Sequence, residues 1–136
     1  MKQLRPLILF GIGGLLYVLI ELIVRGRTHW SMFIVGGLAF FSIGFINEKY
    51  EKMPLAKQML IGALVITTLE FTCGCIVNLW LGWHVWDYSN MPFNLLGQIC
   101  LPFTAIWFFL SAVAVVLDDY IRHLLWGEKI PHYKLF

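Results

Sequence analysis

Four long apolar runs constrain the fold of this chain most: residues 7–24, 30–46, 59–81 and 95–117. A helix needs about 17–25 residues to cross a hydrocarbon core of roughly 30 Å, and each run meets that length. Of all 136 residues, 60% are hydrophobic and only 13% are charged, whereas soluble domains are about 25% charged. We therefore predict an all-α membrane protein whose residues 1–136 form a single four-helix transmembrane domain.

The distribution of the ten Lys and Arg residues predicts how the helices are oriented. If the spans alternate in direction, only Arg25 and Arg27 fall on the side away from the two termini. The other eight share the side of the termini: Lys2, Arg5, Lys49, Lys52, Lys57, Arg122, Lys129 and Lys134. The positive-inside rule then predicts two hairpins in the cell membrane with both termini cytoplasmic. The basic turn after the first span does not resemble a cleavage site, so we expect no cleavable signal peptide, and the few basic residues predict no nucleic-acid partner.

The third span carries a polar stripe. Thr67, Glu70, Gly74 and Asn78 are spaced three, four and four apart and therefore share one helix face. A charged carboxylate near the bilayer centre costs at least about 2.5–3.5 kcal/mol, so Glu70 must pair with a base, be protonated or face a wet cavity. No Lys or Arg lies in the middle of any span. We favour a cavity-facing Glu70 that binds a cation or a proton; a neutral Glu70 hydrogen-bonded to Thr67, Asn78 or a neighbouring helix is the alternative.

The other three spans also have stripes of small and polar residues, which predict the interior of the bundle. They are Gly14, Tyr17, Glu21 and Arg25; Gly36, Phe40, Gly44 and Glu48; and Gly97, Thr104, Ser111 and Asp118. Glu21 has a potential local partner in Arg25 one turn later. The acidic residues Glu48, Asp118 and Asp119 are expected at solvated helix ends or in a docking surface. Glycine faces can pack within one chain or between two, so the stripes leave the oligomeric state open.

Between the third and fourth runs lies the stretch WLGWHVWDYSNMPFN, residues 80–94. It is too polar to span a bilayer, and an interfacial aromatic belt explains only one or two of its aromatic residues. Pro102, predicted inside the fourth helix, should free the carbonyl of Gln98. Irregular polar backbone at membrane depth is tolerated only where protein or a water-filled cavity surrounds it. We predict an aromatic outer loop that covers a central cavity as a lid; an interfacial anchor is the alternative.

Aromatic faces near carboxylates hold organic cations, and a flat, partly polar molecule could stack on the indoles as well. The predicted ligand-binding residues are Glu21, Glu70, Asn78, Trp83, Trp86, Asp87, Tyr88, Asn94 and Gln98. They predict a membrane transport component, a permease for a small cationic or aromatic solute. Cys73, Cys75 and Cys100 lack zinc-type spacing and are expected to be packing residues, so no metal site is predicted. The sequence does not identify a cofactor.

Four stretches carry a resemblance to a known family: GGLAFFSIGFINE (36–48), ITTLEFTCGCIVN (66–78), LGWHVWDYSNMPFNLLGQICL (81–101) and LDDYIR (117–122). They resemble the CmpB-type putative ABC-transporter family, type IV, of small integral membrane proteins. The resemblance implies a multi-pass membrane protein classed as a permease. The positions that match the family pattern are Glu70, Trp86, Asp87, Tyr88, Pro92, Asn94, Gly97 and Gln98.

The chain has no GxxxxGK[ST] phosphate loop and cannot hydrolyse ATP by that route. An ATP-driven system would need a separate ATPase, for which residues 47–57 are the expected docking surface. Four helices are few for a complete pathway, so we expect a homo-oligomer, such as a dimer, or another membrane subunit. A non-transporting accessory protein that regulates a partner is the alternative function. An intramembrane enzyme is less favoured, because His29, His84, Asp87 and Glu70 match no HExxH or GxSxG motif.

Overall fold

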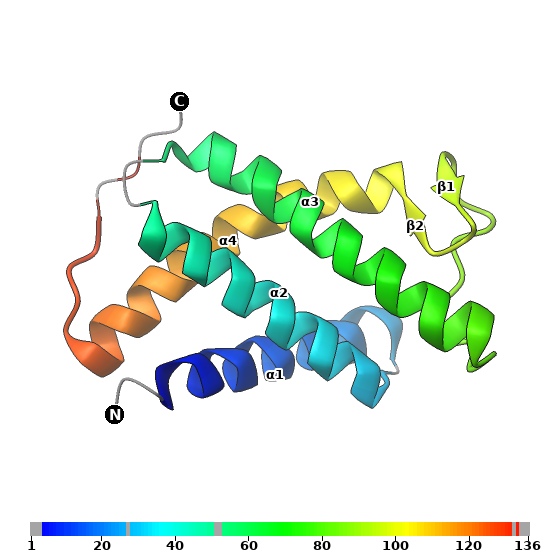
Figure 1. The fold of residues 1–136 in the computed structure, drawn as a ribbon, viewed down its shortest axis with the longest axis horizontal. Coiled ribbons are helices and arrows are strands. Elements are labelled where there is room, and N and C mark those ends of the chain that lie inside the picture. Colours follow the sequence, from blue (N-terminus) through cyan, green and yellow to red (C-terminus); the bar gives the residue numbers. More distant parts are fainter. Residues whose placement is uncertain (1–3, 27, 51–52, 132, 134–136) are drawn as a thin grey trace.

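The protein is described from a computed structural model, which covers residues 4–26, 28–50, 53–131 and 133. Helices α1 (Arg5–Arg25), α2 (Trp30–Lys49), α3 (Leu55–Gly74) and α4 (Leu101–Trp126) run alternately in opposite directions (Figure 1). All four helices, α3 with its continuation to Trp80, are long and apolar enough to cross a membrane. Both chain termini lie at one end of the bundle, here called the terminal end, and the opposite end is called the loop end.

Local chemistry explains where the helices begin and end. Pro6 and Pro102 occupy the first turns of α1 and α4, where a missing backbone N–H costs nothing. Gly26 and Gly127 follow these helices with φ of 72° and 70°, the left-handed conformation that glycine adopts without strain. The side chain of His29 caps α2 by accepting a hydrogen bond of 3.2 Å from the backbone N–H of Ser31.

The fourth helix differs from its predicted bounds. Residues 95–100, predicted as its first turns, lie outside α4, and strands β1 (Asn94–Leu95) and β2 (Ile99–Cys100) pair there in antiparallel register. Pro102 starts the helix instead of interrupting it, because proline fits only the first turn without removing an internal hydrogen bond. The helix also continues to Trp126, so Asp118 and Asp119 lie about two turns before its end and not at it.

Beyond Gly74, α3 continues as a π-helical turn, η2 (Cys75–Trp80). Turns of this type are rare and usually adjust the direction of side chains near functional positions. Here the turn contains Asn78, which is buried and faces the segment that follows the helix. The wider turn therefore marks the place where the third span passes into residues 81–100, called below the loop segment.

The glycine faces of the helices pack within the chain. A Cβ atom on Gly13 would overlap Phe40, and one on Gly36 would overlap Tyr17, so these glycines let α1 and α2 approach closely. A Cβ atom on Gly62 of α3 would overlap Ser111 of α4. Most members of the predicted stripes are buried in the bundle, among them Gly36, Gly44, Ser111 and Asp118. Glu48 is exposed and Gly97 lies before α4, so the prediction of an interior face fails at these two positions.

We expect Gly13→Val to destabilise the protein and Gly11→Val to leave it nearly unchanged. A Cβ atom on Gly13 would meet Phe40 and the backbone of Gly36, whereas nothing lies within 4 Å of one on Gly11. Overpacking of this kind costs about 1–3 kcal/mol. Both variants change helix propensity by the same amount, so the difference between their thermal unfolding midpoints in detergent isolates the packing. Equal midpoints for the two variants would contradict the packing described.

Candidate functional site

Asn78 holds the loop segment against the helices. Its Oδ1 accepts hydrogen bonds from the backbone N–H of Val85 (2.7 Å) and of Trp86 (3.4 Å), and its Nδ2 donates to Oε1 of Gln98 (2.8 Å). The indole N–H of Trp86 donates to the Gln98 carbonyl at 3.0 Å. The prediction that Pro102 frees this carbonyl within a helix is wrong, because Gln98 lies before the start of α4. Gly74 makes room for the Gln98 side chain, because its Cβ would lie 2.6 Å from Gln98 Oε1. Asn78, Trp86 and Gln98 are all buried.

Glu70 lies beneath the loop segment and is only 3% exposed. Its Oε1 accepts a hydrogen bond from the Tyr88 hydroxyl at 2.7 Å, and its Oε2 accepts one from the indole N–H of Trp107 at 2.8 Å. The Tyr88 ring stacks on Phe103, with ring centroids 4.8 Å apart. The carboxylate therefore joins three parts of the chain: α3, the loop segment and α4. Of its neighbours on the polar stripe, Thr67 pairs with Thr104 of α4 at 3.1 Å.

The pKa of Tyr88 depends on its burial and on the carboxylates nearby. Burial raises the pKa of Tyr88 above its ordinary range, and the nearby charge of Glu70 and the hydrogen bond to it act in the same direction. Tyr17 and the charge of Glu21 also raise the pKa of Tyr88, although less. Glu21 is 8% exposed, and its effect on Tyr88 places it within electrostatic reach of the loop segment. The side chain of Arg25, its predicted ion-pair partner, lies outside the described residues.

We expect the Tyr88 phenol to resist ionisation at alkaline pH, because a phenolate could not donate to Glu70 and would repel it. The folded-state pKa is raised, so this contribution to stability is complete below the ordinary tyrosine pKa of about 10 and is lost as the pH rises beyond it. The difference in tyrosinate absorbance between the wild-type protein and the Tyr88→Phe protein should show no step near pH 10. Protein unfolded in SDS is the control and should recover that step. A step near pH 10 in the folded protein would show that Tyr88 is not held as described.

Three other predicted site residues lie outside this buried cluster. Trp83 packs against His29 and Trp30, with ring centroids 5.4 and 5.6 Å away, and stays 44% exposed. Asp87 is exposed, and the backbone N–H of Ser89 donates to its Oδ1 at 2.9 Å. That hydrogen bond is the main cause that lowers the pKa of Asp87. Arg27, which the charge pattern would place on the same side of the membrane as Asp87, lies outside the described residues.

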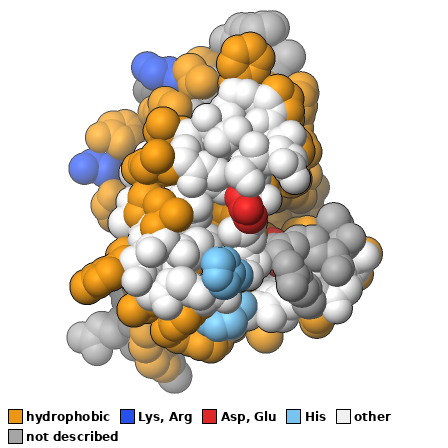
Figure 2. Space-filling view, turned by 90° about the vertical axis from the view of Figure 1, so that its right-hand side faces the viewer, with side chains coloured by type: hydrophobic (Ala, Val, Ile, Leu, Met, Phe, Trp, Pro, Cys, Tyr) orange, Lys and Arg blue, Asp and Glu red, His pale blue; other side chains and the backbone are white. Residues whose placement is uncertain are grey.

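Asn94, the third of these residues, shapes the turn of the loop segment. Its Nδ2 donates to the Met91 carbonyl at 2.9 Å, and its Oδ1 accepts from the backbone N–H of Gly97 at 3.1 Å. Figure 2 looks onto the loop end and shows histidine side chains next to each other with acidic atoms close by. The loop end therefore has an exposed aromatic and polar surface above Glu70, Tyr88 and Trp107, called below the Glu70 cluster.

Two residues of the buried site, Trp107 and Tyr17, were not predicted as site residues. Trp107 lies three residues after Thr104 and four before Ser111, so it shares their helix face. A tryptophan in the middle of a span needs a partner for its indole N–H, and the carboxylate of the third span was a candidate. Tyr17 packs edge to face on Trp107, with centroids 6.0 Å apart. Tyr17 lies one turn before Glu21 and shares its helix face. This spacing is the feature of the sequence that could have identified Tyr17 as a site residue.

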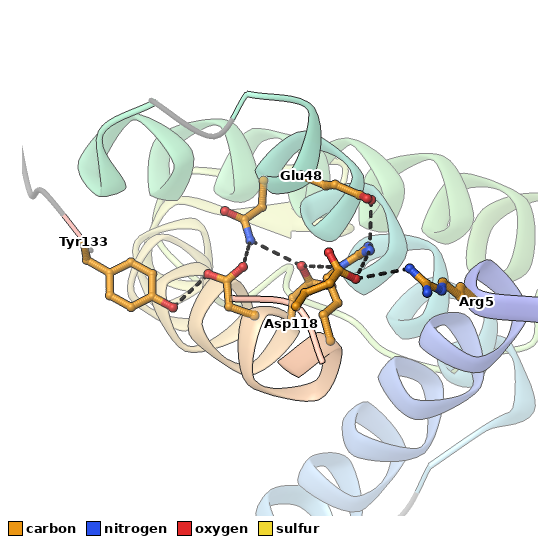
Figure 3. Close-up of polar contacts among 8 residues, drawn as sticks. Arg5, Glu48, Asp118 and Tyr133 are labelled. Carbon is orange, nitrogen blue, oxygen red and sulfur yellow. Dashed lines mark hydrogen bonds and ion pairs between the residues drawn. The ribbon is translucent and has the colours of Figure 1, made fainter. Parts of the chain in front are cut away.

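The terminal end holds a second polar cluster, formed around Arg122 (Figure 3). The guanidinium Nε of Arg122 donates to both oxygens of Asp118, at 3.1 and 3.0 Å, and its Nη1 lies 2.9 Å from Glu48. Glu128 pairs with Arg5 at 3.3 Å. The terminal-end cluster consists of Arg5, Asn47, Glu48, Asp118, Asp119, Arg122, Glu128 and Tyr133. Residues 51–52 of the expected docking loop lie outside the described part of the chain.

The structure also bears on metal binding. Among the described residues, no group of three or more His, Cys, Asp or Glu side chains could hold a metal ion. Cys73, Cys75 and Cys100 are free cysteines. The polar atoms around Glu70 are carboxylate, phenol and indole groups that hydrogen-bond to one another.

Comparison with known proteins identifies a family model that matches this chain. The family model described as "Putative ABC-transporter type IV" matches residues 4–132, nearly the whole chain. This match confirms the resemblance carried by the four sequence stretches, and it is to a transporter-type family and not to an enzyme family. No solved structure matches the chain.

Proposed function

The chain belongs to the "Putative ABC-transporter type IV" family, and from that premise we propose that it is a membrane transport component which binds a small organic cation at its loop end. The observation that carries the proposal is the buried Glu70, which receives hydrogen bonds from Tyr88 of the loop segment and Trp107 of α4. A carboxylate within a span is costly and usually marks a pathway for solutes or ions.

The chemistry of the cluster suits a cation. An ionised carboxylate offers about four lone-pair sites, of which Tyr88 and Trp107 occupy two. The aromatic rings beside Glu70 can add cation–π attraction, which strengthens when water is excluded. Neutral aromatic solutes could stack on the same rings, but only a cation would also compensate the charge of Glu70. Glu21 adds a second carboxylate within electrostatic reach.

The remaining predicted residues divide into two groups by their positions. Trp83 and Asp87 lie on the exposed surface of the loop end and would make the first contact with an approaching cation. The others hold the loop segment closed over Glu70: Asn78, Trp86, Asn94 and Gln98. The segment thus acts as the proposed lid, and release of the solute requires it to open.

The proposed orientation follows the positive-inside pattern, with the loop end outside and the terminal end in the cytoplasm. The terminal-end cluster would then face any separate ATPase subunit, since the chain lacks a phosphate loop of its own. A homodimer or another membrane subunit would supply the rest of the pathway.

Tetramethylammonium is a suitable probe, and its binding to purified protein can be measured by calorimetry. Glu70→Gln should weaken the affinity by at least about 30-fold, because losing one partner of a buried charge pair costs about 2 kcal/mol or more. Glu128→Gln removes a half-buried carboxylate at the terminal end and should bind as wild type does. Neopentyl alcohol has the same shape without charge and should not compete. Equal binding by wild type and Glu70→Gln would contradict the proposed site.

A non-transporting accessory protein is the second candidate function. It is favoured by the fact that both oxygens of Glu70 already accept hydrogen bonds, so that Glu70 could serve only to fasten the loop segment. In that case no cation would bind, Glu70→Gln would loosen the loop segment, and a partner protein would copurify in fixed ratio.

A further inference from the structure

An apolar cleft lies between α1 and α4, in the middle of the bundle. It has a volume of about 110 Å³, and its side walls include Gly13 and Tyr17 of α1 and Trp107 and Val113 of α4. Residues of α2, among them Phe40, also line it. Ile20 and Val113, which border it, are 39% and 59% exposed. The cleft therefore opens onto the outer, lipid-facing surface of the two helices.

The cleft and the Glu70 cluster share a wall. The ring of Trp107 lines the cleft, and the indole N–H of the same side chain donates to Glu70 at 2.8 Å. On the opposite wall, Tyr17 lines the cleft and Glu21 follows one turn later on α1. The lining itself is aliphatic and aromatic and contains neither carboxylate. Glu70 and Glu21 lie next to the lining residues Trp107 and Ile20, at the end of the cleft that faces the loop segment.

We propose that this cleft is the apolar subsite of the solute site and that it takes the alkyl chain of an amphiphilic organic cation. The inference rests on the proposed function, because the cationic head would occupy the Glu70 cluster. An apolar cavity of about 150 Å³ can bind a molecule as large as benzene, so about 110 Å³ accommodates a few methylene groups. The chain would contact Trp107, whose N–H reaches the carboxylate that holds the head.

The negative charges of Glu21 and Glu70 favour an amphiphilic organic cation over a bilayer phospholipid as the occupant of the cleft. A phospholipid whose acyl chain entered the cleft would bring its phosphate toward the end where Glu21 and Glu70 lie, and like charges repel. A quaternary ammonium head is complementary to the same carboxylates and to the aromatic rings around them. The solutes expected are therefore cations with a short apolar tail that enter from the membrane side.

The test is a binding series of ethyl-, propyl-, butyl- and pentyltrimethylammonium, all of which dissolve in water. In wild type, each added methylene should strengthen binding by up to about fourfold until the cleft is full, as expected for burial of a CH₂ group. Val113→Phe places a ring at the mouth of the cleft and should abolish this dependence on chain length. Ile106→Phe is the matched control, because Ile106 lies two turns earlier on α4, is 50% exposed and does not line the cleft. It should behave as wild type.

The possible outcomes distinguish a failure of the cleft proposal from a failure of the proposed cation site at Glu70. If tetramethylammonium binds in a Glu70-dependent way but longer chains add nothing, the cleft is not a subsite and the proposed function stands. If longer chains bind more tightly and Val113→Phe does not change that gain, the chains lie elsewhere and the inference is overturned. If tetramethylammonium does not bind wild type at all, the proposed function fails together with the inference. Should Val113→Phe not fold, Ala114→Leu narrows the same cleft from a neighbouring position.

Discussion

Replacing Arg122 by methionine should lower the free energy of unfolding by about 3–5 kcal/mol, the usual cost of leaving a buried charge without its partner. Asp118 is completely buried, and Nε of Arg122 donates to both of its oxygens within 3.1 Å. Asn47 also donates to Asp118, but at 3.3 Å, and an amide cannot replace a positive charge. Methionine keeps most of the side-chain length, so the loss measures the charge and the hydrogen bonds. Reversible unfolding by SDS in mixed micelles gives the free energy.

Two comparisons make the Arg122 result specific. Glu128→Gln removes the half-buried carboxylate that pairs with Arg5 at 3.3 Å, and it should cost less than about 1 kcal/mol, as exposed ion pairs do. Adding Asp118→Asn to Arg122→Met should recover much of the stability, because the uncompensated charge is then absent. If Arg122→Met costs no more than Glu128→Gln, the buried pair does not stabilise the terminal end as described.

Replacing Asn78 by alanine should release the loop segment. The backbone N–H of Val85 and the side-chain oxygen of Gln98 would lose their partners, and each unsatisfied buried group costs about 1–3 kcal/mol. The segment can avoid this cost only by opening to water. We therefore expect a loss of stability of about 2–6 kcal/mol and faster hydrogen exchange throughout residues 81–100, measured by mass spectrometry.

Matched variants separate the role of Asn78 from a general effect of mutation. Asn78→Asp keeps the oxygen that accepts from Val85 but loses the donor to Gln98, and it should give intermediate exchange. Asn90→Ala changes an exposed asparagine of the same segment and should leave exchange of the amides at Val85 and Trp86 unchanged. If the amides of Val85 and Trp86 exchange as slowly in the Asn78→Ala protein as in wild type, then contacts other than those of Asn78 hold the loop segment.

The sequence by itself determined the four helices long and apolar enough to cross a membrane, most of the inner faces and the place of Glu70 on one of them. These properties follow from hydrophobic length and from the helical repeat, both of which are local. The polar stripe of the third span does face α4 and the loop segment: Thr67 meets Thr104, Glu70 meets Trp107 and Asn78 meets Gln98.

Only the tertiary structure decided which groups meet across the bundle. Tyr88 and Trp107 reach Glu70 from segments 18 and 37 residues away along the chain, and no repeat in the sequence specifies such a pairing. The same holds for the cluster around Arg122, whose acidic members Glu48, Asp118 and Asp119 were expected at solvated helix ends or in a docking surface. The start of α4 depended on how the chain leaves the hairpin at residues 94–100, since hydropathy alone continues across it. Hydrogen bonds between distant segments depend on the packing of all four helices, and therefore hydropathy and periodicity, which are properties of single segments, cannot predict them.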